Sequence, residues 1–217
     1  MTAERPKHQF YGRRKGKPLR RLHAGLMESL LPQVKIDPGQ PLHGMNTPRM
    51  LEIGFGGGEH LAHQAALNPD VCYLGAEPFL NGVAKLLSEV ETRGLKNVRV
   101  HYGDARPLLE ILPVESFARI YLLYPDPWLK ERQKKRRFVN AANLAHFARI
   151  LQPKGQFWFA SDIEDYVAWT RDEIAASRLF REEGDSTVPF EDWVQTRYEA
   201  KARKAGRGSH YLRFIKS

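Results

Sequence analysis

Apolar stretches predicted to be strands alternate with helical patterns from residue 49 onwards, and this alternation restricts the possible folds more than any other feature. The predicted strands are Arg49–Ile53, Val71–Ala76, Val98–Tyr102, Ala118–Leu123 and Gln156–Ala160. The predicted helices that follow them are Glu59–Leu67, Leu80–Arg93, Pro107–Leu112, Phe138–Ile150 and Ile163–Ala176. Such alternation builds a mostly parallel sheet with helices on both faces, so we expect a doubly wound α/β fold.

The two ends of the chain extend this pattern. Residues 1–21 contain eight Lys or Arg and no apolar pattern, so we predict a flexible basic arm followed by a single domain over residues 22–217. Residues 22–34 are predicted to form a short helix. Near the C-terminus, two further strands are predicted around Leu179–Glu182 and Tyr211–Ile215, with a loop or a helix between them.

Composition limits the class of protein. A chain of 217 residues with 42% hydrophobic content can bury the core of one domain. Its single cysteine, Cys72, excludes an intramolecular disulfide and a Cys-rich zinc site, and the eight histidines lack metal-ligand spacing. The longest apolar stretch, Ile120 to Tyr124, is too short to span a bilayer, and no apolar segment of a secretory signal follows the N-terminus. We expect a cytoplasmic protein with no metal, no membrane partner and no obligate protein partner.

Positive charge is concentrated in three segments, which are residues 1–21, 130–137 and 197–216. They hold 21 of the 34 Lys and Arg residues and only three acidic residues, whereas the remainder has 13 basic and 22 acidic residues. This segregation indicates a localised binding site for a polyanion such as a nucleic acid. Solvated, partly disordered tails are the alternative. An anionic membrane fits less well, because the basic runs lack a regular apolar face.

A glycine-rich turn with the sequence LEIGFGGG, residues 51–58, joins the first predicted strand to the first helix. It carries three glycines at alternating positions: Gly54, Gly56 and Gly58. Glycines there let a ligand approach the backbone, and the helix N-terminus offers free N–H groups. Glu59 stands where the dinucleotide-binding fingerprint needs a glycine, and Glu52 would repel a pyrophosphate but could pair with a sulfonium or an ammonium. Both points favour S-adenosylmethionine over NAD as the cofactor.

Two more acidic residues stand at the ends of predicted strands. Glu77 closes the second strand, where a carboxylate can accept hydrogen bonds from both ribose hydroxyls. Asp104, followed by Ala105, ends the third strand, where it could accept from an adenine amino group. Each residue alone could be a helix cap or a turn residue. Together with Glu52 they place three acids at successive strand ends, which favours a cofactor site.

The fourth predicted strand ends in LYPDPWLK, residues 123–130. Two prolines flank Asp126 and would stiffen the turn, and Trp128 offers a face on which a base can stack. A rigid turn with a core tryptophan is the alternative. Candidate phosphate contacts follow directly: Arg132, Lys134, Lys135, Arg136 and Arg137. Asp162 ends the fifth strand and adds a carboxylate at the same edge, although it could equally cap the next helix.

From about Arg49 to Phe214 the sequence resembles the bacterial tRNA (guanine-N7)-methyltransferases. The resemblance rests on PDPW-x-K with the basic run after it, on LEIGFGGGEHL upstream and on TRYEAKARKAG downstream. It implies a Rossmann-like class I methyltransferase domain with a seven-stranded sheet and an antiparallel last strand. It also implies methyl transfer from S-adenosylmethionine to N7 of guanine-46 in the tRNA variable loop. The family usually has His at the position of Gln133, and Pro or His at the position of Leu129.

The resemblance also implies roles for individual residues. Cofactor contacts correspond to Glu52, Glu77, Asp104 and Asp126, of which Asp126 is also the proposed catalytic residue. Substrate contacts correspond to six positions: Lys130, Asp162, Thr196, Arg197, Tyr198 and Glu199.

Three other functions are compatible with parts of the sequence. An exocyclic-amine methyltransferase commonly has Pro-Pro-aromatic after its acidic residue, and Asp126-Pro127-Trp128 matches this only partly. A cytosine-C5 methyltransferase needs a nucleophilic cysteine, but Cys72 lies inside a predicted strand away from the turn. A noncatalytic RNA-binding protein on the same type of sheet is the alternative from another class. The intact acids at the strand ends argue against it.

Overall fold

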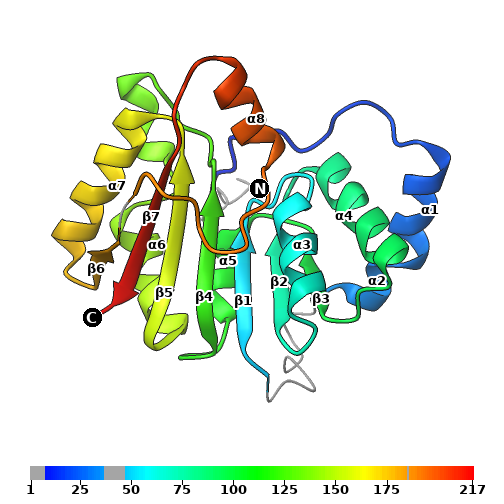
Figure 1. Cartoon of the computed structure of the whole chain (residues 1–217). Helices are drawn as coiled ribbons and strands as arrows, with labels where there is room; N and C mark the ends of the chain where they lie inside the picture. Colours follow the sequence, from blue (N-terminus) through cyan, green and yellow to red (C-terminus); the bar gives the residue numbers. More distant parts are fainter. Residues whose placement is uncertain (1–7, 37–46, 185) are drawn as a thin grey trace, which may run out of the picture.

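The computed structural model describes residues 8–36, 47–184 and 186–217 (Figure 1). Seven strands form one sheet in the order β3-β2-β1-β4-β5-β7-β6. The strands are β1 Arg49–Ile53, β2 Cys72–Ala76, β3 Val98–His101, β4 Phe117–Leu123, β5 Leu151–Ser161, β6 Phe180–Glu183 and β7 His210–Lys216. Only β7 runs antiparallel to its neighbours, β5 and β6. The predicted seven-stranded, mostly parallel sheet with an antiparallel last strand is confirmed.

Helices cover both faces of this sheet (Figure 1). They are α1 Arg21–Ser29, α2 Leu31–Val34, α3 Glu59–Leu67, α4 Leu80–Arg93, α5 Ala105–Ile111, the 3₁₀ helix η1 Glu131–Arg136, α6 Ala141–Ile150, α7 Glu164–Ser177 and α8 Arg197–Lys204. One apolar core includes residues of α5, α6 and α7, and a second core on the other face includes residues of α1, α3 and α4. The central strands are apolar on both sides because each side faces a layer of helices.

The alternation of side chains along β5 illustrates this arrangement. Phe157 and Phe159 belong to the core beneath α6 and α7, whereas Trp158 and Ala160 belong to the core on the opposite face. Phe157 lies against Phe147 of α6, with ring centroids 4.9 Å apart. Burying aromatic side chains on each face supplies much of the hydrophobic stabilisation that holds the two layers to the sheet.

Two helical regions differ from the prediction. Helix α6 begins at residue 141 rather than at Phe138, because the Asn140 side chain accepts a hydrogen bond from the Asn143 N–H at 3.0 Å and caps the helix there. Residues 22–34, predicted as one helix, form two short helices, α1 and α2, joined at Leu30. The helix predicted as one alternative near the C-terminus is present as α8.

Strand β5 also begins earlier than predicted. It starts at Leu151 rather than at Gln156, and its pairing with β4 shifts register between Phe117 and Arg119. Lys154 lies within this early part at a φ of 60°. Pro153 and Gly155 flank Lys154 and are typical of loops, which is why the sequence indicated a strand only from Gln156 onwards.

The strand order reverses between β1 and β4, and this reversal positions the functional site. From β1 the chain builds outward through β2 and β3, whereas β4 and β5 lie on the other side of β1. In such sheets the loops at the carboxyl ends separate at the reversal and leave a crevice. Helix α8, between β6 and β7, crosses above this edge of the sheet (Figure 1). Among the described residues, no helix has the length and apolar character needed to cross a membrane.

Candidate active site

A cavity of about 470 Å³ opens at the carboxyl edge of the sheet, lined by residues that end or follow β1, β2, β3 and β4. This volume is typical of small-molecule sites. Twelve residues predicted to be functional line it: Gly54, Gly56, Glu77, Asp104, Ala105, Asp126, Trp128, Lys135, Arg136, Arg137, Arg197 and Tyr198. Within the described parts of the chain, no group of three or more His, Cys, Asp or Glu side chains could hold a metal ion.

The glycine turn forms one wall of the cavity. Gly54 and Gly56 have φ values of 70° and 59°, a region that side-chain-bearing residues rarely adopt. A Cβ atom on Gly57 would lie 1.4 Å from Nη2 of Arg197, so the absence of a side chain there lets α8 pack on the turn. The guanidinium of Arg197 is held in place by Glu59 at 2.6 Å. The turn and α8 are therefore joined by a direct polar contact.

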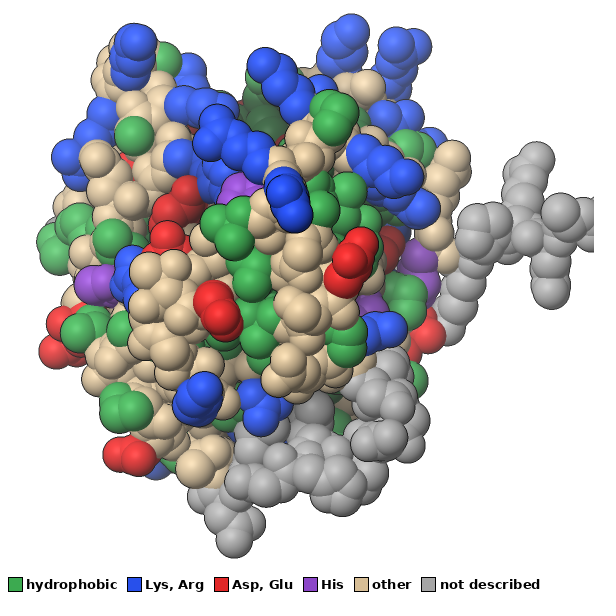
Figure 2. Space-filling model, turned by 90° about the vertical axis from the view of Figure 1, so that its right-hand side faces the viewer, with side chains coloured by type: hydrophobic (Ala, Val, Ile, Leu, Met, Phe, Trp, Pro, Cys, Tyr) green, Lys and Arg blue, Asp and Glu red, His purple; other side chains and the backbone are tan. Residues whose placement is uncertain are grey.

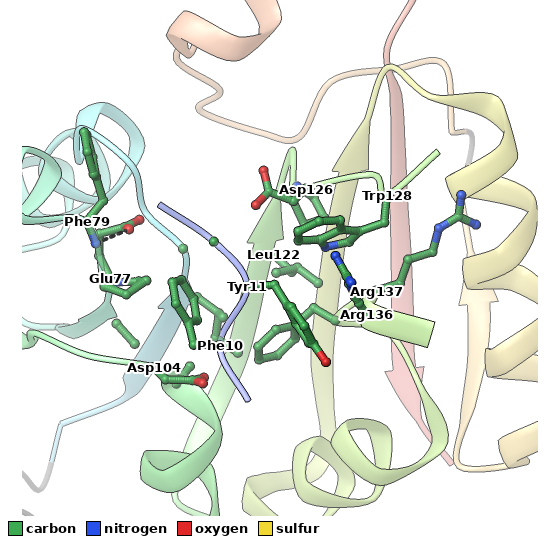
Figure 3. Close-up of a pocket in the computed structure, with 18 of the residues that line it drawn as sticks. Phe10, Tyr11, Glu77, Phe79, Asp104, Leu122, Asp126, Trp128, Arg136 and Arg137 are labelled. Carbon is green, nitrogen blue, oxygen red and sulfur yellow. Dashed lines mark hydrogen bonds between the residues drawn. The ribbon is translucent and has the colours of Figure 1, made fainter. Parts of the chain in front are cut away.

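Glu77 connects the glycine turn to the start of α4. One carboxylate oxygen accepts a hydrogen bond from the Gly56 N–H at 2.7 Å, and the other accepts from the Phe79 N–H at 2.8 Å. Burial, with a smaller contribution from the charges of Asp126 and Glu52, raises the pKa of Glu77 to about 7 against the opposing effect of these two hydrogen bonds. Each oxygen keeps a lone pair for a ligand donor. Figure 3 shows Glu77 on the wall of the cavity opposite Asp126.

Asp104 stands at the end of β3 and caps α5. Its carboxylate accepts from the backbone N–H of Arg106 at 3.0 Å, which is why α5 begins at Ala105 rather than at Pro107. The Arg106 side chain donates to both carboxylate oxygens, with Nε 3.0 Å from Oδ2. The negative charge of Asp104 is thus already paired. Its contact with an adenine amino group stays a prediction, for which further lone pairs are present.

Asp126 lies in a turn whose backbone is strained on both sides. Tyr124 and Trp128 have φ values of 49° and 45°, in the left-handed region where bulky residues are rare. Each such residue costs about 1–3 kcal/mol and persists only where the surroundings enforce it. Asp126 is exposed to the cavity mouth, and desolvation by the surrounding protein raises the pKa of its carboxyl group. Backbone strain beside a ligand cavity is typical of functional sites.

The Arg137 side chain supports this turn from below. Its Nε donates to the Pro127 carbonyl at 2.9 Å, and its Nη1 donates to the Asp165 carbonyl at 3.1 Å. The guanidinium also pairs with the Asp165 carboxylate and lies over the Tyr166 and Trp169 rings, 4.8 and 5.2 Å from their centroids. Arg137 is only 1% exposed. We predicted a phosphate contact for Arg137, but its guanidinium is buried against the turn, and we interpret Arg137 as support for the turn.

Two residues of the predicted cofactor site lie outside the cavity. Glu52 is buried beneath the glycine turn, and its carboxylate lies 2.7 Å from Nδ1 of His60. His60 in turn packs against the Tyr121 and Trp193 rings. Gly58 precedes the first residue of α3 at a φ of 76°. The structure therefore places both residues behind the cavity wall, and their contact with a cofactor stays a prediction.

Several predicted substrate contacts have intramolecular partners. The Thr196 hydroxyl accepts from the Glu199 N–H and caps α8. The Glu199 carboxylate is fully buried and accepts from Trp193 Nε1 at 2.6 Å and from the Tyr211 hydroxyl at 3.1 Å. Asp162 pairs with an arginine of the segment after α8, Arg207, at 2.7 Å. None of these three predicted residues lines the cavity, so their contact with substrate stays a prediction.

The remaining predicted RNA contacts lie around η1. Lys130 and Arg132 are exposed and do not line the cavity. Lys134 pairs with Glu131 at 2.9 Å and with Asp165 at 3.0 Å. In Figure 2, Lys and Arg side chains gather along the upper edge of the molecule, the edge that carries α8 in Figure 1. On this face the positive charge is therefore concentrated at the edge of the sheet at which the cavity opens.

Sequence reasoning missed the N-terminal segment as part of the site. Residues 9–13, which belong to the predicted arm, line the cavity. Phe10 and Tyr11 lie inside it, in the part of the cavity that also holds Glu77, Asp104 and Leu122 (Figure 3). The adjacent aromatic residues Phe10 and Tyr11 could have indicated that this basic segment packs against the domain, because exposed aromatic side chains in a solvated arm are unfavourable. Residues 1–7 of the arm lie outside the described residues.

The sheet order, the glycine turn and the strand-end acids around one cavity define a class I methyltransferase. The chain also matches the model of a family described as "Putative methyltransferase" over residues 46–212. It is 48% identical to the tRNA (guanine-N(7)-)-methyltransferase of Rhizobium meliloti, with 94% of each chain covered. It is 48% identical to the enzyme of that name from Agrobacterium fabrum, with 100% of each chain covered. The chain belongs to the bacterial tRNA (guanine-N7)-methyltransferase family.

Solved structures with low sequence identity share the fold. The 16S rRNA methyltransferase KamB is 15% identical, with a TM-score of 0.61 over 93% of this chain and 97% of that one. A 16S rRNA (adenine(1408)-N(1))-methyltransferase from Catenulisporales acidiphilia, solved with its cosubstrate SAM, is 15% identical. Its TM-score is 0.54 over 78% of this chain and 85% of that one. At this identity the likeness concerns the architecture alone.

Arg137 provides a test of the turn's support. We expect Arg137→Ala to lower the free energy of unfolding by about 1–3 kcal/mol, because it removes a buried side chain and leaves the Pro127 carbonyl without this donor. Arg132→Ala, in the same basic run but exposed, should change stability by less than about 0.5 kcal/mol. Urea unfolding of both variants measures the difference. Equal stabilities would mean that Arg137 does not hold the turn.

Proposed function

We propose that this protein transfers the methyl group of S-adenosylmethionine to N7 of guanine-46 in the variable loop of tRNA, forming 7-methylguanosine in the cytoplasm. The observation that carries this proposal is the meeting of strand-end acids, Trp128 and part of the basic run at one cavity. Membership of the family supports the reaction and the class of substrate. Basic side chains around the cavity mouth suit an RNA backbone.

The cavity suits the cofactor on its glycine-turn side. S-adenosylmethionine supplies an electrophilic methyl group on a positively charged sulfur. Glu77 stands where it can accept hydrogen bonds from ribose hydroxyls, since both its oxygens are already oriented by backbone N–H groups. At Gly54 no side chain stands between the backbone and the cavity. A Cβ there would meet no atom of the protein within 4 Å, so this space is open to a ligand. Phe79, directly before α4, and Ala105, the first residue of α5, line the cavity and offer apolar surface for an adenine.

The chemistry at guanine needs positioning more than proton transfer. N7 carries a lone pair in the plane of the ring, so no proton has to leave before it attacks the methyl group. Catalysis therefore rests on alignment and on electrostatic stabilisation of the positive charge that moves to the base. Asp126 is held by the strained turn at the cavity mouth, where its carboxylate favours that charge. Its other role is to accept from the Watson–Crick N–H groups of guanine, which point away from N7.

The RNA side of the site is basic and partly aromatic. Lys135, Arg136 and Lys201 line the cavity, and Lys130 and Arg132 are exposed beside the turn. Phosphate contacts from such residues orient the RNA without reading its sequence. Tyr198 is 43% exposed and lines the cavity from α8, which suits contact with a nucleotide.

Methylation of unmodified tRNA tests the proposed reaction. The protein is incubated with labelled S-adenosylmethionine and unmodified tRNA, and the modified nucleoside is identified and located by mass spectrometry. We expect 7-methylguanosine at guanine-46, and no product from a matched tRNA that has adenine there. Methylation of an exocyclic amine, or of another nucleotide, would contradict the proposal. Cofactor binding by calorimetry without any transfer would support the noncatalytic alternative.

The raised pKa of Glu77 predicts that cofactor binding depends on pH. Its pKa is about 7, so the carboxyl group is mostly protonated at about pH 6 and mostly ionised at about pH 8. The ionised form accepts stronger hydrogen bonds and attracts the cationic cofactor, so affinity should rise by up to about tenfold over this range. Calorimetric titrations of the wild type and Glu77→Gln measure it. The Gln variant should bind more weakly and lack this rise, and an identical rise in both proteins would exclude Glu77 as its source.

Asp126→Asn tests whether the charge of the carboxylate is needed. Asn has nearly the same shape, so the protein should fold, but we expect single-turnover methylation to slow by about 10²-fold or more, since one preorganised electrostatic group contributes ~3 kcal/mol. The loss should persist at saturating tRNA and cofactor, because the charge develops during transfer. Asp172→Asn is the matched control, since Asp172 is exposed on α7 and does not line the cavity. A wild-type rate for Asp126→Asn would reduce Asp126 to a structural turn residue.

A further inference from the structure

The N-terminal segment crosses the cavity at a defined position. It is fastened to α4, where Asn81 Oδ1 accepts from the Gly16 N–H at 2.8 Å and Asn81 Nδ2 donates to the Lys17 carbonyl at 2.8 Å. It is fastened to α5 as well, where Arg106 Nη2 donates to the Gln9 carbonyl at 3.0 Å. Residues 9–13, between these two attachments, line the cavity.

Tyr11 reaches from this segment to the acceptor side of the cavity. The Arg136 guanidinium lies between two rings, with its central carbon 4.0 Å from the centroid of Tyr11 and 5.1 Å from that of Trp128. The two rings are 6.1 Å apart at an interplanar angle of 74°. Figure 3 shows Arg136 between Trp128 and Tyr11, on the same side of the cavity as Asp126.

The charge of Arg136 has no carboxylate partner among the described residues, unlike the charges of its neighbours. Arg137 and Lys134 both pair with Asp165. The Nε of Arg136 is buried and has no hydrogen-bond partner among the described residues, so aromatic contacts are what hold this side chain. A cation held by rings and left without an anion is suited to an anionic ligand.

We propose that the N-terminal segment is part of the active site, and that Tyr11 positions Arg136 beside Trp128 to bind the phosphate of the methyl-accepting nucleotide. The proposal rests on the proposed function for the identity of that nucleotide. Phosphate is the fitting ligand, because an arginine at the Hoogsteen edge of guanine would oppose the positive charge that develops on the ring. A guanidinium also matches the geometry of phosphate oxygens, with which it forms paired hydrogen bonds.

Tyr11 acts through Arg136 and is a positioning residue. Among the described residues its hydroxyl bonds only to the nearby Gln9 side chain, at 2.9 Å, so the ring face is what Arg136 contacts. Phenylalanine keeps that face, and alanine removes it. Without the ring, one face of the guanidinium opens to water and its long side chain gains other rotamers.

The experiment compares Tyr11→Ala and Tyr11→Phe in the full chain. With unmodified tRNA, we expect Tyr11→Ala to raise the KM for tRNA by about tenfold, with the Kd for S-adenosylmethionine within about twofold of wild type. Tyr11→Phe should keep the wild-type KM. Arg136→Gln should lower affinity for tRNA as well, and Tyr11→Ala should add nothing in the Arg136→Gln background, because the two act on one contact. Cofactor binding also reports that each variant is folded.

Three results would overturn the proposal. The first is a wild-type KM for Tyr11→Ala, and the second is full additivity of the Tyr11 and Arg136 changes. The third is tighter cofactor binding by Tyr11→Ala, which would mean that the segment competes with the cofactor. Measuring tRNA binding by fluorescence anisotropy tests the Tyr11–Arg136 contact independently of the proposed methyl transfer. Non-additive loss of binding without any 7-methylguanosine from the wild type would support the Tyr11 contact and reject the proposed reaction.

Discussion

The reversal of strand order between β1 and β4 is the constraint on which the site depends. It separates the loops after these two strands and leaves a crevice at the carboxyl edge of the sheet. Every element of the site is arranged around that crevice: the glycine turn after β1, Glu77 after β2, Asp104 after β3 and the Asp126 turn after β4. With a different strand order, the same residues would lie at separate places along the edge.

The two sides of the crevice are held by different interactions. On the glycine-turn side, the Glu77 carboxylate joins two backbone turns and is desolvated, which is why its pKa is raised. On the other side, the buried guanidinium of Arg137 fixes a strained turn. Both groups would be costly to bury alone, and each is stabilised by oriented hydrogen bonds. The same interactions that stabilise these loops also orient Asp126 and Glu77 toward the cavity.

The basic residues that follow the Asp126 turn have different roles. Within a few residues, Arg137 supports the backbone, Lys134 forms surface ion pairs, and Arg136 keeps its charge without a carboxylate partner among the described residues. This charge of Arg136 suits RNA binding, because an ion pair with a carboxylate of the protein would have to be broken before a phosphate could bind. The N-terminal segment contributes to this difference by covering Arg136 with Tyr11.

Much of the fold could be predicted from local patterns. Helices α3 and α4 have the predicted bounds, because apolar periodicity runs along both, Gly58 precedes the start of α3, and Gly94 follows the end of α4. The lining of one cavity by Glu77, Asp104 and Asp126 could also be predicted, since parallel strands end at one edge. The predicted start of α6 was wrong, because the side chain of Asn140 caps the helix after the apolar residues Phe138 and Val139.

The sequence by itself determined the sheet, its acidic strand ends and the segregation of basic residues, because each depends on the order of residues along a few turns or strands. Only the tertiary structure decided which of those charged residues face the cavity. Arg136 and Arg137 are adjacent and chemically identical, yet the partner of Arg137, Asp165, lies 28 residues away, and Tyr11 contacts Arg136 from near the N-terminus. Burial and pairing depend on segments brought together by packing, and local sequence carries little information about them.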